Sequence, residues 1–487
     1  MGKKGKHKNK KNNQKEKMTV NKNSHPVDSE SDQEISNTNN SLYSAKAVNC
    51  QACLESKVEP CYPYKPSIKE IVNIFYSKPT TKLVRQAFQL INELVDNHEP
   101  PIDEICCEGL DIFVVQGIQF EDPFIQYYAI HALSVIIERM NEKQIRNLIS
   151  QGLLISVASV LQRDMLFIIQ EGIEVCSKIA MKSAALRDVI ACGSLPVSEL
   201  LSKYYQTIST ELARIVALFL RNLCYLKPVP ESILKRVVNS ARHLLRYQDN
   251  EVRLASLTAI FEAICDDDLT VAFDDTYIEL ILVFLDSPHR AEVKIAFDIA
   301  SQFAGKLNCN TDAIIKAGFI KKILSVLARY SDTEFGFQTC SFLTIILSRK
   351  KYIGLVLDSG LVFLLLGLLD EGTKTYKKEA CKALKSMYNH ISRNDAIKLS
   401  APAYLERICN IITSENNDHV LCALALMNRI LNACSKQEGQ VENQLKLALD
   451  YIRDSEAFDY ITEYINSDHY EIQRLAIEIY SVYFIDI

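Results

Sequence analysis

The stretch ICCEGLDIFVV at Ile105–Val115 decides the fold, because variants of it recur along the chain. Each variant has an apolar residue, three further residues, a glycine and then a mostly apolar run. The same frame stands at 148–158 (LISQGLLISVA), 189–200, 314–324 (IIKAGFIKKIL) and 356–366 (VLDSGLVFLLL). Its glycines are Gly109, Gly152, Gly193, Gly318 and Gly360, which are 43, 41, 125 and 42 residues apart. Because 125 is about three times 42, the chain contains an internal repeat of about 42 residues.

The segments between these glycines have helical patterning. From Ile68 onward, amphipathic or fully apolar segments of 8–16 residues alternate with short polar breaks, and no alternating run is long enough to indicate a strand. A helical repeat of this period is typical of armadillo and HEAT-type solenoids. We therefore expect an all-α fold, in which about ten armadillo repeats over residues 65–487 form a right-handed α-solenoid. Such a fold is first of all a binding surface.

The N-terminal segment differs from the rest in composition. Residues 1–64 lack helical periodicity and are rich in polar residues, so we expect a disordered arm and linker. Residues 1–23 contain nine lysines and one glutamate, whereas the net charge of the whole chain is −5. The remainder must then carry about −13 (−5 minus +8). A basic arm on an acidic body points to partners or surfaces of complementary charge.

The composition also limits the compartment. No apolar run reaches the roughly 18 residues that a membrane span needs, and lysines and asparagines occupy the place of a secretory signal. Most of the fifteen cysteines stand singly in helical segments, which favours a reducing setting. We expect a protein of the cytosol, the nucleus or both. Cys50, Cys53 and Cys61 are either reduced thiols in a linker or part of a metal site, and the first reading is favoured because a fourth ligand is missing.

The sequence contains no motif for enzymatic chemistry. A glycine-rich phosphate loop, HExxH, GxSxG and paired CxxC motifs are all absent. The acidic runs at 266–268 and 274–275 could hold a cation but indicate inter-helix turns. We expect no enzyme, no cofactor, no metal and no small-molecule substrate.

Several repeat segments, taken in order and at the right spacing, resemble the importin-alpha family. They cover residues 66–487: PPIDEICCEGLDIFV (100–114), FIQYYAIHAL (124–133), ALRDVIACG (185–193), NLCYLKPVP (222–230), KKEACKAL (377–384) and NSDHYEIQRLAIEIYSVYF (466–484). The resemblance implies an import adaptor that shuttles between cytoplasm and nucleus. Its partners would be cargo proteins in a concave groove, an importin-beta-like receptor, an export receptor with the GTP-bound transport GTPase, and nuclear pore proteins.

The resemblance also assigns residues to these surfaces. The importin-beta-binding arm would include Lys3, Lys4, Lys6, Lys8, Lys10 and Lys11. The export-receptor surface would include Asp468, His469, Tyr470, Glu471 and Arg474. The cargo groove would include His131, Glu174, Lys178, Lys182, Leu218, Asn222 and Glu379.

The family groove depends on a ladder of Trp and Asn residues four positions apart, and here the sequence departs from it. The chain has no tryptophan. The Trp and Asn positions of repeats 2–8 fall on His131 and Val135, Glu174 and Lys178, Leu218 and Asn222, Thr258 and Glu262, Phe297 and Ser301, Cys340 and Thr344, and Lys382 and Ser386. Lys182 stands where the family has a lysine-pairing aspartate, and Arg139 stands at the matching place in repeat 2. Glu379 matches the acid of the family's minor site.

These losses are large enough to matter. Each missing cation–π pair costs about 0.5–2 kcal/mol, and each unpaired peptide group about 1–3 kcal/mol. Their sum exceeds the roughly 8 kcal/mol of a micromolar complex, so we expect little binding of a classical basic signal. The arm departs too, because the first arginine of the chain is Arg85. It is therefore a reduced importin-beta-binding arm, a solubilising tail, or a segment that contacts RNA or another acidic surface. Two hypotheses remain: a divergent import adaptor, or an armadillo scaffold that has left classical import.

Overall fold

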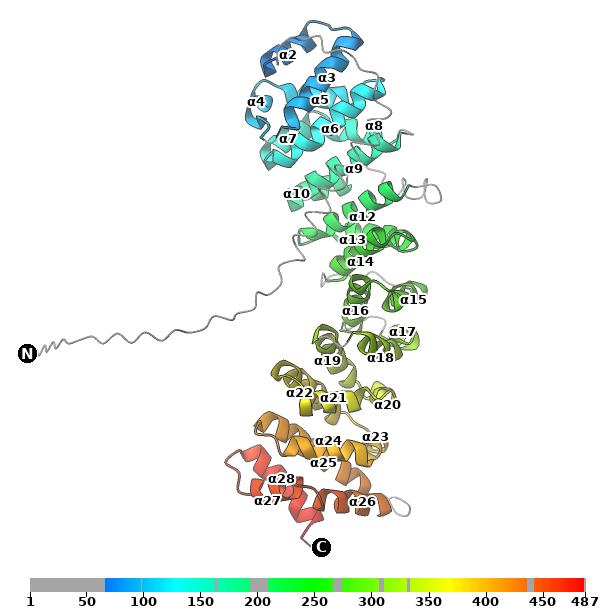
Figure 1. Cartoon of the computed structure of the whole chain (residues 1–487), viewed down its shortest axis with the longest axis vertical. Helices are drawn as coiled ribbons and strands as arrows, with labels where there is room; N and C mark the ends of the chain where they lie inside the picture. The colour runs from blue at the N-terminus through cyan, green and yellow to red at the C-terminus, as the bar shows by residue number, and fades with distance from the viewer. Residues whose placement is uncertain are drawn as a thin grey trace, which may run out of the picture. The chain divides into compact units, whose positions relative to one another are not determined.

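The computed structural model describes residues 66–97, 99–162, 165–192, 209–265, 274–305, 311–330, 333–435 and 442–485. These ranges belong to one compact unit, Pro66–Ile487. They contain helices and connecting turns and no strand. Successive helices stack in chain order from α2 to α28 (Figure 1). The all-α expectation is confirmed, and the fold is an armadillo-type α-solenoid.

Each repeat ends in a long helix, which we call its third helix. The ten third helices of the described ranges are α3 (Thr81–Val95), α6 (Pro123–Arg139), α9 (Leu166–Ala180), α12 (Thr210–Tyr225), α14 (Asn250–Ile264), α16 (Arg290–Gly305), α19 (Thr333–Leu347), α22 (Lys374–Tyr388), α25 (Asn417–Ser435) and α28 (Tyr470–Tyr483). Each contacts the next, from α3 against α6 to α25 against α28. This succession, the third-helix row, runs the length of the stack.

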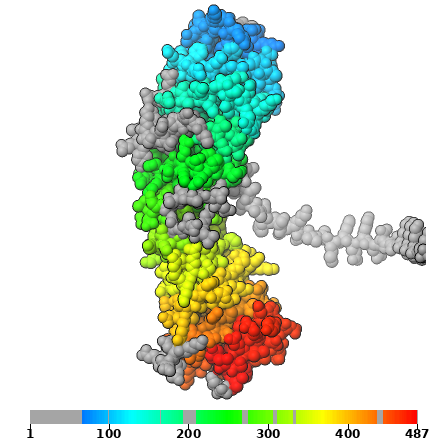
Figure 2. Space-filling model, turned by 180° about the vertical axis from the view of Figure 1, so that it is seen from behind, coloured from blue at the N-terminus to red at the C-terminus, as the bar shows by residue number. Residues whose placement is uncertain are grey.

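Shorter helices precede each third helix, and in most repeats the one directly before it packs against it. They are α2 (Ile68–Tyr76), α4 (Ile102–Cys107), α5 (Leu110–Gly117), α7 (Glu142–Ser150), α8 (Leu153–Leu161), α10 (Ala184–Cys192), α13 (Glu231–Leu244), α15 (Asp275–Val283), the 3₁₀ helix η1 (Phe284–Asp286), α17 (Thr311–Lys316), α18 (Phe319–Arg329), α20 (Lys350–Asp358), α21 (Leu361–Glu371), α23 (Arg393–Lys398), α24 (Pro402–Ile412), α26 (Glu442–Arg453) and α27 (Ala457–Tyr464). In the space-filling view neighbouring colours adjoin and distant ones do not (Figure 2).

The repeated glycines have a backbone role. Gly109, Gly152, Gly318 and Gly360 have φ of +73°, +96°, +87° and +82°, and each joins a first helix to a second helix. A side chain is strained in this left-handed region, whereas glycine is not. The sequence period therefore marks a left-handed turn that these four repeats share. Gly193 lies outside the described ranges.

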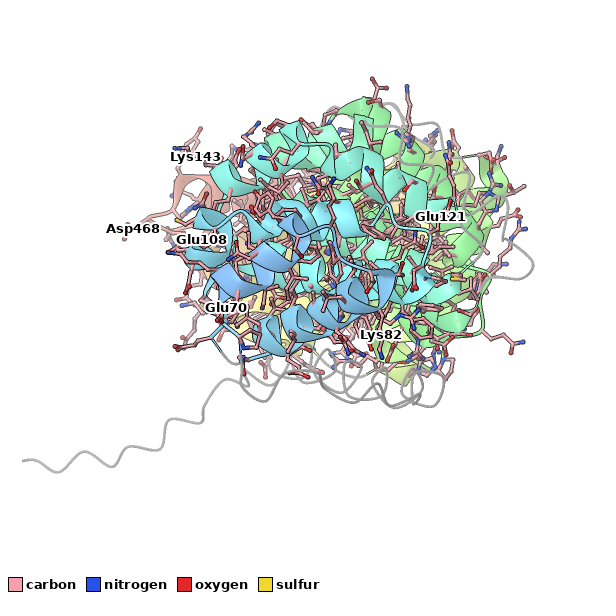
Figure 3. All side chains as sticks on the ribbon, turned by 90° about the horizontal axis from the view of Figure 1, so that it is seen from above. Glu70, Lys82, Glu108, Glu121, Lys143 and Asp468 are labelled. Atoms are coloured by element: carbon pink, nitrogen blue, oxygen red, sulfur yellow. The ribbon has the colours of Figure 1, made fainter. Side chains whose placement is uncertain are left out.

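The apolar core is continuous from one repeat to the next. Phe297 on α16, for example, packs edge-on against Phe319 and Phe335, with ring centroids 5.2 and 5.9 Å apart, and Phe319 packs against Phe342 at 4.8 Å. Such pairs add about 0.5–1.5 kcal/mol each beyond their burial. Charged side chains such as Lys82, Glu121 and Lys143 project outward, as the view along the stack shows (Figure 3). Each repeat thus buries its apolar face against its neighbours.

In the described ranges, no individual helix has both the length and the apolar character for a membrane span, although α20 and α21 pass that test together with an 81° bend between them. The same ranges hold no group of three or more His, Cys, Asp or Glu side chains arranged for a metal ion. Cys50, Cys53 and Cys61 lie outside them, as do the lysines of the arm and the acidic run at 266–268.

Candidate protein-binding surface

The solvent-facing side of the third-helix row is the surface on which the sequence places cargo contacts. His131, Glu174 and Lys178 are half-buried there, and Leu218 is 36% exposed. The flanking apolar residues of the same helices point into the core. These positions of α6, α9 and α12 therefore lie outside the apolar core, and Lys382 is likewise exposed on α22.

The residues that the sequence assigns to the groove in repeats 6 and 7 are wrong. Phe297 and Cys340 are fully buried, because both belong to the core packing of α16 and α19. Asp298 and Ser341, one residue later, are the half-buried residues at this level. Adjacent positions of a helix are only about a quarter turn apart, so the pattern of apolar residues alone does not decide which of the two faces solvent.

His131 is held by the third helices on either side. Its Nε2 lies 3.4 Å from Asp96 Oδ1 at the end of α3, and its Nδ1 lies 3.5 Å from Glu171 Oε1 on α9. Burial of the imidazole opposes protonation, but the hydrogen bonds and charges of the two carboxylates outweigh it and raise the pKa of His131 to about 10. The ring also stacks on Tyr127, with centroids 5.9 Å apart. His131 is thus held as an imidazolium between carboxylates of the two neighbouring repeats.

Lys178 and Lys182 both reach back to the preceding repeat. Lys178 Nζ lies 2.9 Å from Glu138 Oε2 and donates to Ser134 O at 3.2 Å. Lys182 Nζ donates to Glu138 O at 2.7 Å. Burial, with repulsion from Lys178, lowers the pKa of Lys182 although Glu138 opposes the shift. The two lysines thus share one neighbouring residue, which partly neutralises this stretch of the row.

The one asparagine that remains at a family ladder position is engaged between repeats. Asn222 on α12 donates through Nδ2 to Ser177 Oγ on α9 at 2.8 Å. Glu174, one turn before Lys178, is half-buried on the same helix. In the static structure the Asn222 amide is therefore committed to the preceding third helix.

Two acids lie on the row, and the sequence predicted only one of them. Asp298, which the sequence reading missed, accepts a hydrogen bond from Gln338 Nε2 on α19. Burial, with repulsion from Glu334, raises its pKa to about 6, while Lys294 lowers it. Glu379, which the sequence reading identified, lies 2.6 Å from Lys382 Nζ, and its side chain is 14% exposed against 51% for the lysine. The lysine therefore covers the acid expected to receive a cargo lysine.

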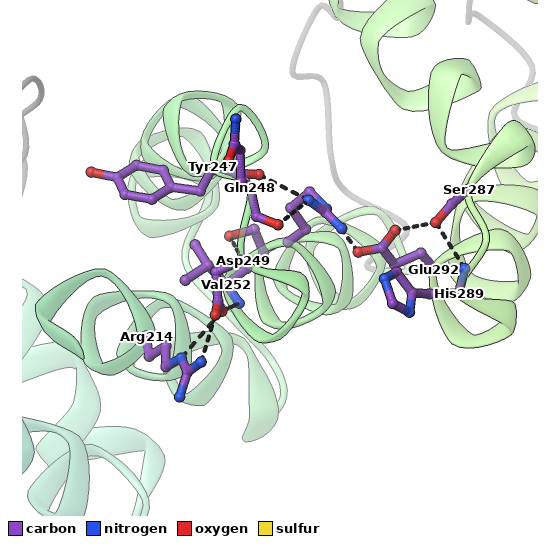
Figure 4. Close-up of polar contacts among 10 residues, drawn as sticks. Arg214, Tyr247, Gln248, Asp249, Val252, Ser287, His289 and Glu292 are labelled. Atoms are coloured by element: carbon purple, nitrogen blue, oxygen red, sulfur yellow. Dashed lines mark hydrogen bonds and ion pairs between the residues drawn. The ribbon is translucent and has the colours of Figure 1, made fainter. Parts of the chain in front are cut away.

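Arginine–carboxylate pairs join the starts of successive third helices. Arg214 on α12 binds Asp249, the N-cap of α14, through Nε at 3.2 Å. Arg253 on α14 binds Glu292 at 2.8 Å, and Ser287 donates its hydroxyl to the same carboxylate (Figure 4). Glu292 is 1% exposed. These links fix the spacing of neighbouring repeats along the row.

The proposed export-receptor residues cluster at the start of α28. Asp468, Tyr470, Glu471 and Arg474 are exposed, and the Tyr470 side chain is 73% accessible. His469 precedes the helix and is half-buried, with its backbone N–H 3.2 Å from Ser467 Oγ. Four of the five residues are thus exposed at the start of the last described third helix.

Comparison with known proteins places this surface in context. No family model matches the chain. One curated relative is importin subunit alpha-2 of Caenorhabditis elegans, 22% identical over 277 residues, which are 56% of this chain and 52% of the relative. The match thus spans about half the length of that protein.

Two solved structures share the fold. An engineered protein has a TM-score of 0.58 and 19% identity, with 84% of this chain and 97% of that chain covered. A chain from a study of a phosphorylation switch in the interaction between cadherin and beta-catenin also has a TM-score of 0.58, with 11% identity and coverage of 85% and 93%. The chain has an armadillo-type fold in common with these structures.

Proposed function

We propose that this chain is an adaptor related to the importin-alpha proteins that binds a partner protein along the third-helix row. It binds that partner by contacts other than the Trp and Asn ladder. The partial match to an importin alpha subunit supports the relationship. The ten stacked third helices supply a long surface for an extended segment.

The occupation of the ladder positions by contacts between repeats carries this proposal. His131 is held by Asp96 and Glu171, Lys178 by Glu138, and Asn222 by Ser177. A basic signal would have to break these contacts before making its own. The row is therefore built to hold its own repeats in register at the places where the family holds a lysine-rich peptide.

Isothermal titration with a lysine-rich monopartite signal peptide tests the proposal. We expect a Kd weaker than about 100 μM, equivalent to about −5.5 kcal/mol. Low-micromolar binding would contradict it, especially binding that is lost in Lys182→Glu or is unchanged in Glu379→Lys. The control is a peptide of the same length in which alanine replaces lysine.

The import role extends to the two ends of the chain. We propose that Lys3, Lys4, Lys6, Lys8, Lys10 and Lys11 contact an importin-beta-like receptor, and that the turn Asp468–Arg474 contacts an export receptor loaded with the GTP-bound transport GTPase. Movement through the pore, with pore-protein contacts, would then let the chain shuttle between cytoplasm and nucleus. Full-length protein with the six lysines changed to serine should lose the first receptor, and Tyr470→Ala with Glu471→Lys should weaken the second.

A scaffold outside nuclear import is the second candidate function. The commitment of His131, Lys178 and Asn222 to neighbouring repeats favours it, because these contacts replace the family's means of holding cargo. Imaging of the tagged full chain distinguishes the two functions. An import adaptor should accumulate in the nucleus when export is blocked, and should stop doing so when the six arm lysines are changed to serine. Equal distribution of both proteins would favour the scaffold.

A further inference from the structure

We propose that α22 is the docking site for an acidic segment of a partner protein on the third-helix row. This inference rests on the proposed function, because it names the chemistry of the partner that the row would hold. It reverses the charge expected of a cargo for an importin-alpha-like groove. The observations that carry it are the charge of α22, the side on which that charge lies, and the pairing of the acids nearby.

The helix α22 carries an excess of positive charge. Its sequence KTYKKEACKALKSMY contains five lysines and one glutamate, a net charge of +4 in an acidic body. Lys374, Lys378 and Lys382 are four residues apart, and Lys385 follows three residues later. Residues at this spacing lie on one side of a helix. A line of lysines, the lysine stripe, therefore runs the length of α22.

The lysine stripe lies on the solvent-facing side of the row. Lys374, Lys378 and Lys382 are exposed, whereas the opposite side buries Ala380, Cys381, Ala383, Leu384 and Met387. A segment lying along the third helices would meet the stripe directly.

The acids around the stripe already have cationic partners. Glu379 pairs with Lys382, Asp418 pairs with Lys385 at 2.9 Å, and Asp370 and Glu371 both pair with Arg407 on α24. Glu334, the acid of the neighbouring α19, pairs with Arg290 and Lys294 of α16.

Lys374 and Lys378 have no ion-pair partner among the described residues. The nearby acids are committed to other cations, so an incoming carboxylate would find two lysines ready to pair. Like charges four residues apart repel each other and destabilise a helix. A bound acidic segment would relieve that repulsion.

The neighbouring third helix adds apolar surface. Phe337 on α19 is 43% exposed, and the Tyr376 ring lies so close to Gly336 that a Cβ there would be 3.0 Å from it. An extended segment could thus place carboxylates on the lysine stripe and an apolar side chain against Phe337. The chain's own lysine-rich arm has the same sign as the stripe, so it is the wrong occupant.

Fluorescence anisotropy of a short glutamate- and leucine-containing peptide with the full chain tests the inference. The probe carries a photoreactive group, and the same peptide with glutamine in place of glutamate is the neutral comparison. The variant Lys374→Glu, Lys378→Glu and Lys382→Glu should bind the acidic peptide about tenfold more weakly. A matched variant with Lys143→Glu, Lys321→Glu and Lys446→Glu changes the net charge equally on exposed positions away from the row and should bind it within about twofold of the unsubstituted chain.

The outcomes separate this inference from the proposed function. Cross-linking to α19 or α22, together with a loss specific to the stripe variant, supports both. Cross-linking to the row with equal affinity in all three proteins overturns the acidic docking site but leaves the adaptor function standing. The inference is overturned if the acidic peptide does not bind, or if the two variants lose affinity equally. It is also overturned if a single-stranded DNA binds the lysine stripe more tightly than the acidic peptide does. Cross-linking only outside the row contradicts the proposed function as well.

Discussion

Single charged residues on the third-helix row hold neighbouring repeats together. His131 spans Asp96 and Glu171, which belong to the repeats before and after its own. A histidine with a pKa near neutrality would lose this role as the pH rises, but here the two carboxylates stabilise the charged ring. The charge on His131 is thus a structural element under physiological conditions.

The substitution His131→Gln should destabilise the first repeats by about 2 kcal/mol, because it removes hydrogen bonds to a charged group. The folded pKa of about 10 lies above the unfolded value, which is about 6.5. The stabilisation is therefore complete below pH ~6.5 and is lost as the pH rises through about 10. Urea unfolding of both proteins across this range should show the difference shrinking with pH.

Proton titration by NMR provides the control in the same sample. His131 should titrate near pH 10, while His243, whose pKa is lowered by burial and by Arg246 and Arg242, should titrate below its ordinary value. Two histidines titrating together near pH ~6.5 would contradict the arrangement of Asp96, His131 and Glu171.

A second prediction concerns the backbone strain that the repeated glycines avoid. Gly152→Ala should cost about 1–2 kcal/mol, because alanine is strained at φ +96° although the added Cβ meets nothing within 4 Å. Gly367→Ala, inside α21 and also free of contacts, should stabilise by up to about 1 kcal/mol. Thermal unfolding followed by circular dichroism measures both. Equal destabilisation of the two variants would contradict backbone strain at Gly152 as the cause.

Third helices are linked to one another through their own N-caps. Asp122 caps α6 and pairs with Arg85 of α3, and Asp249 caps α14 and pairs with Arg214 of α12. Burial alone would raise the pKa of both carboxyls, but hydrogen bonds from the arginines and from backbone amides lower it. One side chain thus starts a helix and sets its distance from the previous one.

Substitutions at Asp249 should separate these two roles. Asp249→Asn keeps the cap but weakens the pair with Arg214, so the free energy of unfolding should fall by about 0.5–1 kcal/mol. Asp249→Ala removes the cap as well, which adds about 1 kcal/mol. Because the folded pKa is lowered, the ion-pair contribution is present above pH ~3.9 and is lost as the pH falls through the lowered value. Denaturation of both variants at neutral and acid pH checks this order. An Asn variant as unstable as the Ala variant would contradict it.

Across the whole unit, each repeat is stabilised mainly by contacts with its immediate neighbours. Third helices contact the adjacent third helices in the row, so an opening in one repeat is felt mainly by the next. Local unfolding of different repeats can then occur with different free energies.

The substitution Ile479→Ala tests this coupling in the last described repeat. Ile479 is fully buried in α28, and its truncation should cost about 2–5 kcal/mol. Hydrogen exchange should accelerate in α25–α28 while amides of α6 and α9 keep their protection. Ile130→Ala, also fully buried, is the matched variant at α6 and should give the opposite distribution. Uniform acceleration in either variant would show one cooperative unit.

The sequence by itself determined the repeat and its helices. Apolar residues at helical spacing can be buried only if neighbouring repeats stack, and glycines recurring at multiples of about 42 residues mark turns that need a positive φ. The same pattern placed His131, Glu174, Leu218 and Lys382 on the solvent-facing side. These properties are local, so short stretches of sequence are enough to encode them.

Only the tertiary structure decided what those residues contact. The distance from Lys178 to Glu138, from Asn222 to Ser177 and from Asp96 to His131 depends on how two helices about one repeat apart pack together. The side of α16 that carries Asp298 instead of Phe297 depends on the same packing. Sequence spacing specifies a helix face to within about one residue, whereas a hydrogen bond must be placed to within a fraction of an ångström.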